Sequence, residues 1–149
     1  MRARDLATPY PSLAPDTPAE EAARLLAEEA VEGVFVQDDQ GELQGLVSDT
    51  SLLAFLLPRY LAEDRALVRV LGEDVADALW QRLRGRPVRD LLQTSTAGLP
   101  EVDADDTLVS VAATLARTGA SLVAVRGRDG RLLGGITTSR LLTRLLGIR

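Results

Sequence analysis

The sequence predicts an α/β protein made of two copies of one unit, because three sequence signals occur twice in the same order. These signals are Arg-Asp-Leu, an Asp-Thr pair ahead of an Ala- and Leu-rich segment, and Gly-x-Leu-x-Gly. Their positions are 4–6 and 89–91, 16–17 and 106–107, and 41–45 and 130–134. An internal repeat decides the architecture, so the function is to be sought in a duplicated unit.

Each unit is expected to open with a short strand and an amphipathic helix. The strands are weak, near Leu13 in the first unit and over 99–102 in the second. Asp106 or Thr107 can cap the helix of the second unit, and Pro18 suits the first turn of its counterpart, where a missing N–H costs nothing. The apolar residues that share one face of these helices are Ala22, Leu25 and Leu26, and Leu108, Val111, Ala112 and Leu115.

Two apolar runs joined by a glycine-containing turn then predict a β-hairpin in each unit. The expected strands are 34–36 and 43–47 in the first unit, and 122–125 and 132–136 in the second. A segment rich in Ser and Thr, 48–51 or 137–139, follows each hairpin and can cap a leucine-rich helix. Each unit is therefore predicted to run β-α-β-β-α.

Between the units, residues 58–86 are expected to form a helical insert. An apolar stripe over 53–61 is interrupted by Pro58, which should end or kink that helix near Leu57. A second stripe over 71–83 is closed by the Gly and Pro that follow it. Two roles stay open for the insert: a lid or dimer element, or a bridge that covers the edge of the core.

The repeated pattern of Arg-Asp-Leu, Asp-Thr-x-x-x-x-Ala, an apolar strand and Gly-x-Leu-x-Gly-h-h-[Ser/Thr] resembles the cystathionine β-synthase (CBS) domain in tandem. The resemblance covers nearly the whole chain apart from the insert. It implies one compact Bateman module, with CBS motifs at 1–57 and 87–149 packed by pseudo-twofold symmetry around two clefts. Proteins of this family commonly sense adenine nucleotides or adenosyl compounds and regulate a partner.

Composition argues against catalysis and against a metal site. The chain has no Cys, His or Lys, so thiolate, imidazole and Schiff-base chemistry are missing, and carboxylates are weak bases near neutral pH. We expect neither enzyme activity nor a cofactor. No apolar run reaches the roughly 18 residues of a membrane span, and the N-terminus lacks the apolar stretch of a signal peptide, so we expect a cytoplasmic protein.

Charge is divided unevenly along the chain. Residues 1–75 carry 15 acidic side chains and 6 arginines, and residues 76–149 carry 7 acidic side chains and 11 arginines. The basic half suits a phosphorylated small molecule or the acidic half of a second copy, or is simply a solvated face. Nucleic acid is not expected, because the pI is near 4.8 and few aromatic residues are available for stacking.

The family resemblance also implies a ligand pattern, Gly-h-h-[Ser/Thr]-x-x-Asp, in which the hydroxyl contacts phosphate and the aspartate accepts from ribose. The hydroxyl is present as Ser48 and Thr137, but Ser51 and Arg140 stand where the aspartate is expected. Arg140 can pair with phosphate but cannot accept from a ribose, which favours the second unit as a phosphate site. The expected ligand residues are Thr137, Thr138, Arg140, Ser48, Ser51 and Thr8.

Two alternatives accompany this hypothesis. Ser48 and Thr137 can cap the helices that follow them with no ligand at all. The family pattern also has a Thr among its ligand residues: Thr8 matches it in the first unit, and Gln93 stands at that position in the second. The second alternative concerns the function of the whole module. We therefore predict a non-catalytic module that senses a small molecule, and keep as alternative a structural or interaction module with degenerate clefts that docks to an enzyme or transporter. The last helix of each unit is rich in leucine, and we expect one monomer not to cover these apolar faces fully, so the sequence further predicts a homodimer. The leucines expected in the interface are Leu52, Leu53, Leu56, Leu141, Leu142, Leu145 and Leu146.

Overall fold

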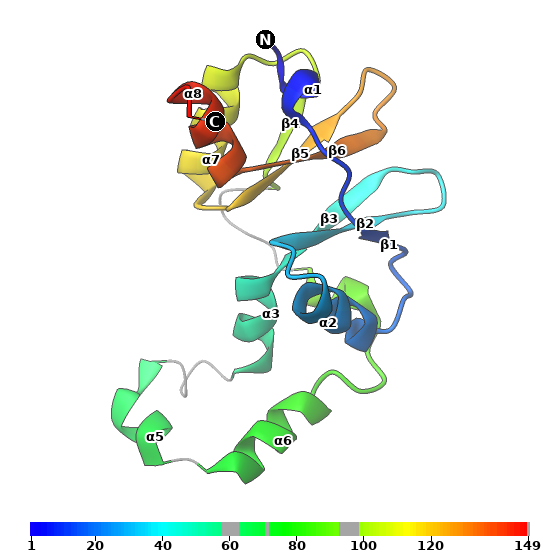
Figure 1. Ribbon diagram of the computed structural model, residues 1–149. Helices are drawn as coiled ribbons and strands as arrows, with labels where there is room; N and C mark the ends of the chain where they lie inside the picture. The colour runs from blue at the N-terminus through cyan, green and yellow to red at the C-terminus, as the bar shows by residue number, and fades with distance from the viewer. Residues whose placement is uncertain (58–62, 71, 93–98, 149) are drawn as a thin grey trace.

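The computed structural model describes residues 1–57, 63–70, 72–92 and 99–148 and confirms the predicted α/β class. Two three-stranded sheets stack on each other, and helices cover their outer sides (Figure 1). The domain boundaries remain predictions from the sequence, with CBS-like motifs at 1–57 and 87–149 and the insert between them. Gln93, Pro58 and Tyr60 lie outside the described residues.

Both units have the predicted element order. The first contains β1 (Ser12–Leu13), α2 (Ala19–Glu28), β2 (Gly33–Gln37), β3 (Leu43–Ser48) and α3 (Asp49–Leu56). The second contains β4 (Glu101–Asp103), α7 (Leu108–Thr118), β5 (Leu122–Arg126), β6 (Leu132–Thr137) and α8 (Thr138–Leu145). In each sheet the middle strand pairs in parallel with the opening strand and antiparallel with the last. The repeat seen in the sequence is thus a repeat of topology.

The opening helix of each unit packs against the other unit. Helix α1 (Ala3–Leu6) places Ala3 and Leu6 in the core formed by α7, α8 and the second sheet. The short helix η1 (Val88–Leu91) places Val88 and Leu91 in the core formed by α2, α3 and the first sheet. Each hydrophobic core is therefore completed by residues that stand about a whole unit away in the sequence.

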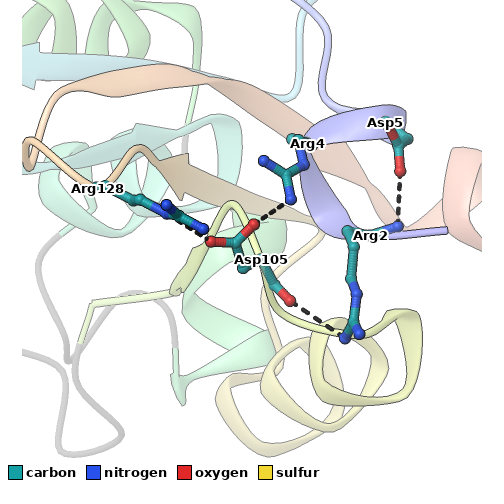
Figure 2. Close-up of polar contacts among 5 residues, drawn as sticks. All are labelled: Arg2, Arg4, Asp5, Asp105 and Arg128. Carbon is teal, nitrogen blue, oxygen red and sulfur yellow. Dashed lines mark hydrogen bonds and ion pairs between the residues drawn. The ribbon is translucent and has the colours of Figure 1, made fainter.

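Polar contacts fix α1 on the second unit. Figure 2 shows the Asp105 carboxylate between Arg4 and Arg128, with which it forms ion pairs. Arg128 Nε lies 3.0 Å from Asp105 Oδ2, and Arg2 Nη1 donates to the Asp105 carbonyl at 3.3 Å. The hydrogen bond from Arg128, together with the positive charges of Arg4 and Arg2, holds the pKa of Asp105 below 3.8 although some desolvation opposes this.

The two equivalent helices α2 and α7 begin differently. Thr107 caps α7, because its hydroxyl accepts from the Ser110 N–H, as predicted. The prediction for α2 is wrong by one residue: Pro18 occupies the cap position itself and makes no side-chain cap bond. The first helical N–H, that of Ala19, instead donates to the Arg86 carbonyl at 2.8 Å. The backbone before η1 thus satisfies the donor that a cap side chain would otherwise serve.

The sheets meet through a small apolar cluster that joins the two units. Its buried members are Phe35, Leu43, Leu122 and Ala124. Two glycines allow the close approach: a Cβ at Gly33 would lie 3.1 Å from a Leu122 methyl, and a Cβ at Gly135 would lie 3.1 Å from the Phe35 ring. A side chain at either glycine would force neighbouring side chains of this cluster to shift, so glycine favours the close packing of the sheets.

The insert contains α5 (Arg65–Val70) and α6 (Glu73–Gln81), which extend away from the sheets beyond α3 (Figure 1). Helix α3 ends at Leu56, and Leu57 is extended, as expected for a residue that precedes a proline. At the end of the insert Leu83 is fully buried in the first core. The bridging role is therefore seen at Leu83, and the lid or dimer role of α5 and α6 stays a prediction.

Candidate ligand-binding clefts

A cavity of about 720 Å³ opens between the two units at the point where β3 meets α3. Its walls come from residues of β3 and the first turns of α3, from Leu92, from Leu99 and Pro100, and from the junction of α7 and β5 at 118–122. We call it the first cleft. Ligand pockets in proteins are typically ~300–1,000 Å³, so a small organic molecule fits this volume.

The described residues that line the first cleft carry no charged side chain. Polar groups there are hydroxyls and one amide, and the remaining wall is largely aliphatic. The polar side chains are Gln44, Ser48, Thr50, Ser51, Thr118 and Ser121, and the large apolar ones are Leu46, Leu92, Leu99 and Leu122. Such a lining matches a flat apolar ring that carries neutral hydrogen-bonding groups.

Ser48 and Ser51 cap α3 reciprocally, which confirms the capping prediction for this junction. The Ser51 N–H donates to Ser48 Oγ at 3.1 Å, and the Ser48 N–H donates to Ser51 Oγ at 2.8 Å. The two preceding helix N–H groups are also engaged, because Asp49 N–H points to the Glu32 carbonyl and Thr50 N–H to its neighbour Asp49 Oδ1. The start of α3 is therefore a satisfied helix end rather than a ready anion site.

Thr137 caps α8 in the equivalent way, and this prediction is also confirmed. The Arg140 N–H donates to Thr137 Oγ1 at 3.1 Å, and Thr137 is buried. Thr138 N–H donates to the Ser121 carbonyl at 3.0 Å within the second unit, as Asp49 N–H does to the Glu32 carbonyl in the first. The Arg140 guanidinium is turned to the opening helix, where its Nε donates to the Leu6 carbonyl at 2.6 Å.

Thr8 lies along the edge of β6. Its N–H donates to the Gly135 carbonyl at 3.0 Å and its carbonyl accepts from the Gly135 N–H at 2.8 Å. A Cβ at Gly134 would lie 2.4 Å from the Thr8 carbonyl oxygen, so glycine is required for this contact. Thr8, Thr137 and Arg140 therefore gather at one place, which we call the second cleft: the junction of β6 and α8 with residues 7–11.

Tyr10 lies in the second cleft, a placement that our sequence analysis missed. Its hydroxyl donates to Glu32 Oε2 at 3.1 Å, and its ring meets Phe35 edge to face with centroids 6.2 Å apart. Burial raises the pKa of Tyr10 to about 12, the Glu32 charge and hydrogen bond add to this, and the Arg140 charge opposes it. The available signal was the Pro-Tyr-Pro sequence ahead of β1, where the second unit has a smaller leucine ahead of Pro100.

The structure brings together two of the expected residues, Ser48 and Ser51, in the first cleft, and it adds Thr50, which was not named from the sequence. Arg140 with Ser139 lines a hollow of about 550 Å³ between α1 and α8. A third hollow, of about 470 Å³, lies between the two hairpin turns and is bordered by Arg126 and Arg131.

Two features are absent from the described part of the chain. No group of three or more Asp or Glu side chains is placed to hold a metal ion there. Among the same residues no helix is both long enough and apolar enough to cross a bilayer.

Comparison with known proteins agrees with this architecture. The CBS domain family model matches residues 3–58. The crystal structure of a CBS domain-containing protein of unknown function from Kribbella flavida is 37% identical over 98% of this chain and 99% of that chain, with a TM-score of 0.77. The chain belongs to the CBS domain family, and its two units are a pair of CBS motifs.

Two further structures are similar over nearly the full length. CBSX2, a CBS-pair protein from Arabidopsis thaliana, is 28% identical over 99% of this chain and 95% of that chain, with a TM-score of 0.75. A crystal structure of CBSX2 in complex with AMP is also 28% identical, over 99% of this chain and 97% of that chain, with a TM-score of 0.70. A search of the curated proteins finds no match.

Proposed function

We propose that this protein is a non-catalytic regulatory module that binds an adenine nucleotide or a related adenosyl compound in the first cleft. The observation that carries the proposal is the cavity of about 720 Å³ between the CBS motifs. The complex of CBSX2 with AMP supports the ligand class, since that chain is similar to this one over nearly its full length.

The lining of the first cleft supports the adenosine part of such a ligand more than its phosphate. Leu46, Leu92 and Leu122 supply apolar surface for a purine ring. Thr50 and Ser121 present hydroxyls that can both donate to and accept from a ribose, which partly replaces the missing family aspartate. No described lining residue offers a positive charge to phosphate, so we expect adenosine to compete well with AMP.

Titration calorimetry with AMP, adenosine, ATP and S-adenosylmethionine tests this proposal. Ala54 lines the cleft from the exposed side of α3, so Ala54→Trp should fill the cavity and abolish binding. Ala27→Trp is the matched control, because Ala27 is exposed on α2 and does not line the cleft. Equal binding by both variants, or no binding of any of these compounds to the wild type, would contradict the proposal.

The phosphate site expected from sequence at Thr137, Thr138 and Arg140 stays a prediction. If a nucleotide phosphate replaces the Leu6 carbonyl as partner of Arg140, then Arg140→Ala should weaken nucleotide binding about tenfold or more, since a hydrogen bond to a charged group is worth about 1.5–3 kcal/mol. The same calorimetric series decides it: Arg140→Ala should then affect AMP and leave adenosine unchanged.

The alternative function, an interaction module, is favoured by one observation, the apolar surface of α8. Leu142, Leu145 and Leu146 are 49%, 48% and 66% exposed, while Leu141 is buried and belongs to the core. On α3, Leu53 is exposed and Leu52 is buried. We therefore propose a homodimer through the exposed leucines at these helices. Leu52 and Leu141, which the sequence analysis also assigned to the interface, are buried within the protomer and are left out of it.

A further inference from the structure

We propose that the Tyr10 side chain is a built-in occupant of the second cleft, in the position that a ligand ring would take in the first, so that this ring position is open in one cleft and filled in the other. Binding of a ligand ring in the first cleft rests on the proposed function. The claim about Tyr10 rests on the geometry of the second cleft and is tested separately.

Strand registers establish which positions of the two clefts correspond. Ser12 pairs with Phe35 in the first sheet, and Glu101 pairs with Ala124 in the second. Counting back along the chain from Ser12 and Glu101, Tyr10 is equivalent to Leu99. Leu99 lines the open first cleft, whereas Tyr10 carries a larger side chain at the corresponding point of the second.

Two of the residues beside Tyr10, Gly135 and Glu32, are also equivalent to lining residues of the first cleft. Gly135 corresponds to Leu46, and its backbone would place a Cβ only 3.2 Å from Tyr10 Cδ2. Glu32 corresponds to Ser121, and it accepts the Tyr10 hydrogen bond. In the second cleft Tyr10 thus lies beside the counterparts of two residues that line the cavity of the first.

The chemistry of these contacts is that of an aromatic ligand with a hydroxyl group. The phenol donates to a carboxylate, and its ring meets the edge or face of Phe35. A phenol of ordinary pKa 10 is already protonated, and therefore a donor, at physiological pH, and burial raises the pKa of Tyr10 further, to about 12. Glu32 therefore already accepts from Tyr10 the hydrogen bond that it would otherwise accept from a ribose hydroxyl.

The backbone on the N-terminal side of Tyr10 is held in place. Thr8 forms two backbone hydrogen bonds with Gly135, and Arg140 bonds the Leu6 carbonyl. The occupant is thus carried by a segment fixed on both β6 and α8. Removing the ring while leaving these bonds should leave a hole of the same shape, lined by one carboxylate and one aromatic ring.

Chemical rescue with p-cresol, which is the tyrosine side chain as a free molecule, tests this directly. Tyr10→Ala should bind p-cresol and recover thermal stability as its concentration rises, by mass action on the native state. Wild type and Tyr10→Phe, whose rings fill the site, should show no such rise. Adding Glu32→Gln to Tyr10→Ala should weaken p-cresol binding about tenfold, because the charged acceptor is lost. Equal p-cresol effects on wild type and Tyr10→Ala, or no effect on either, would overturn the proposal.

A second variant covers the case in which Tyr10→Ala does not fold. Tyr10→Leu installs the residue found at the equivalent position of the first cleft, and it should bind one more equivalent of adenosine than the wild type in calorimetry. Ala54→Trp added to Tyr10→Leu should leave one. If Tyr10→Leu binds the same number of adenosine equivalents as the wild type, the proposal about Tyr10 is contradicted. If the wild type binds no adenosine but Tyr10→Leu does, the proposed function of the first cleft is contradicted and the proposal about Tyr10 is not.

Discussion

Phe35 offers the sharpest test of how the two motifs hold together. It is fully buried in the middle strand of the first sheet, and it belongs to the cluster that also contains Leu122 and Ala124 of the second. Phe35→Ala would leave a cavity between two sheets that are each held rigid by hydrogen-bonded strands, so little collapse is expected. Phenylalanine-to-alanine changes in cores cost about 3–5 kcal/mol, and the edge-to-face contact with Tyr10 adds about 0.5–1.5 kcal/mol.

We therefore expect a loss near the upper end of that range, about 4–5 kcal/mol, which is a large part of the ~5–15 kcal/mol that stabilises an ordinary domain. Urea unfolding followed by circular dichroism should show it: with a slope of about 2 kcal/mol per molar, the midpoint falls by roughly 2 M. Leu133→Ala is the control, since Leu133 is half exposed on β6 and should change stability by under about 0.5 kcal/mol. A loss below about 1 kcal/mol for Phe35→Ala would refute the idea that this cluster joins the motifs.

Three further predictions follow from single side chains. Leu145→Glu places a charge on the exposed face of α8 and should convert the proposed dimer to a monomer in light scattering; a dimer that survives contradicts that interface. The ion pairs of Asp105 stabilise the wild type above the ordinary pKa of 3.8, and this stability is lost as pH falls through the lowered folded-state pKa. Asp105→Asn should therefore be less stable than the wild type near neutral pH, and the urea unfolding curves of the two proteins should converge in acid. In a Tyr60→Phe background, where Tyr10 is the single tyrosine, tyrosinate absorbance should appear near pH 12 rather than 10, and Glu32→Gln should move it down. Because that pKa is raised in the folded state, the associated stability is present below pH 10 and lost as pH rises toward 12.

Local patterns were sufficient for the elements but not for their partners. The hairpins and the caps at Ser48 and Thr137 follow from apolar alternation and from hydroxyls at strand ends, which act within a few residues. The exchange of opening helices was not predictable in this way. Leu6 and Leu91 occupy the same position of the repeat, so the sequence is equally consistent with each packing on its own unit or on the other.

The site shows the same limit. The family comparison directed attention to Arg140 and Ser51, which replace one residue of a known motif. It could not reveal Tyr10, because that residue lies outside the Gly-h-h-[Ser/Thr]-x-x-Asp ligand pattern, in the connection between α1 and β1, and its role depends on Glu32 and Gly135, which are distant in sequence. One side chain in the connection between α1 and β1 thus decides whether the ring position of a cleft is open or filled. Hydrophobic periodicity carries no information about the size of that side chain.

The connection from α1 to β1 crosses from one motif to the other within residues 7–11, and Figure 1 shows it running between the two sheets. Two of those residues, Pro9 and Pro11, have a φ angle fixed by their rings, and they flank Tyr10. The connection is thus a stiff strut rather than a flexible tether. A rotation of one motif against the other would have to change the few free backbone torsions of this connection. We therefore expect such a rotation to displace the Tyr10 ring at the same time.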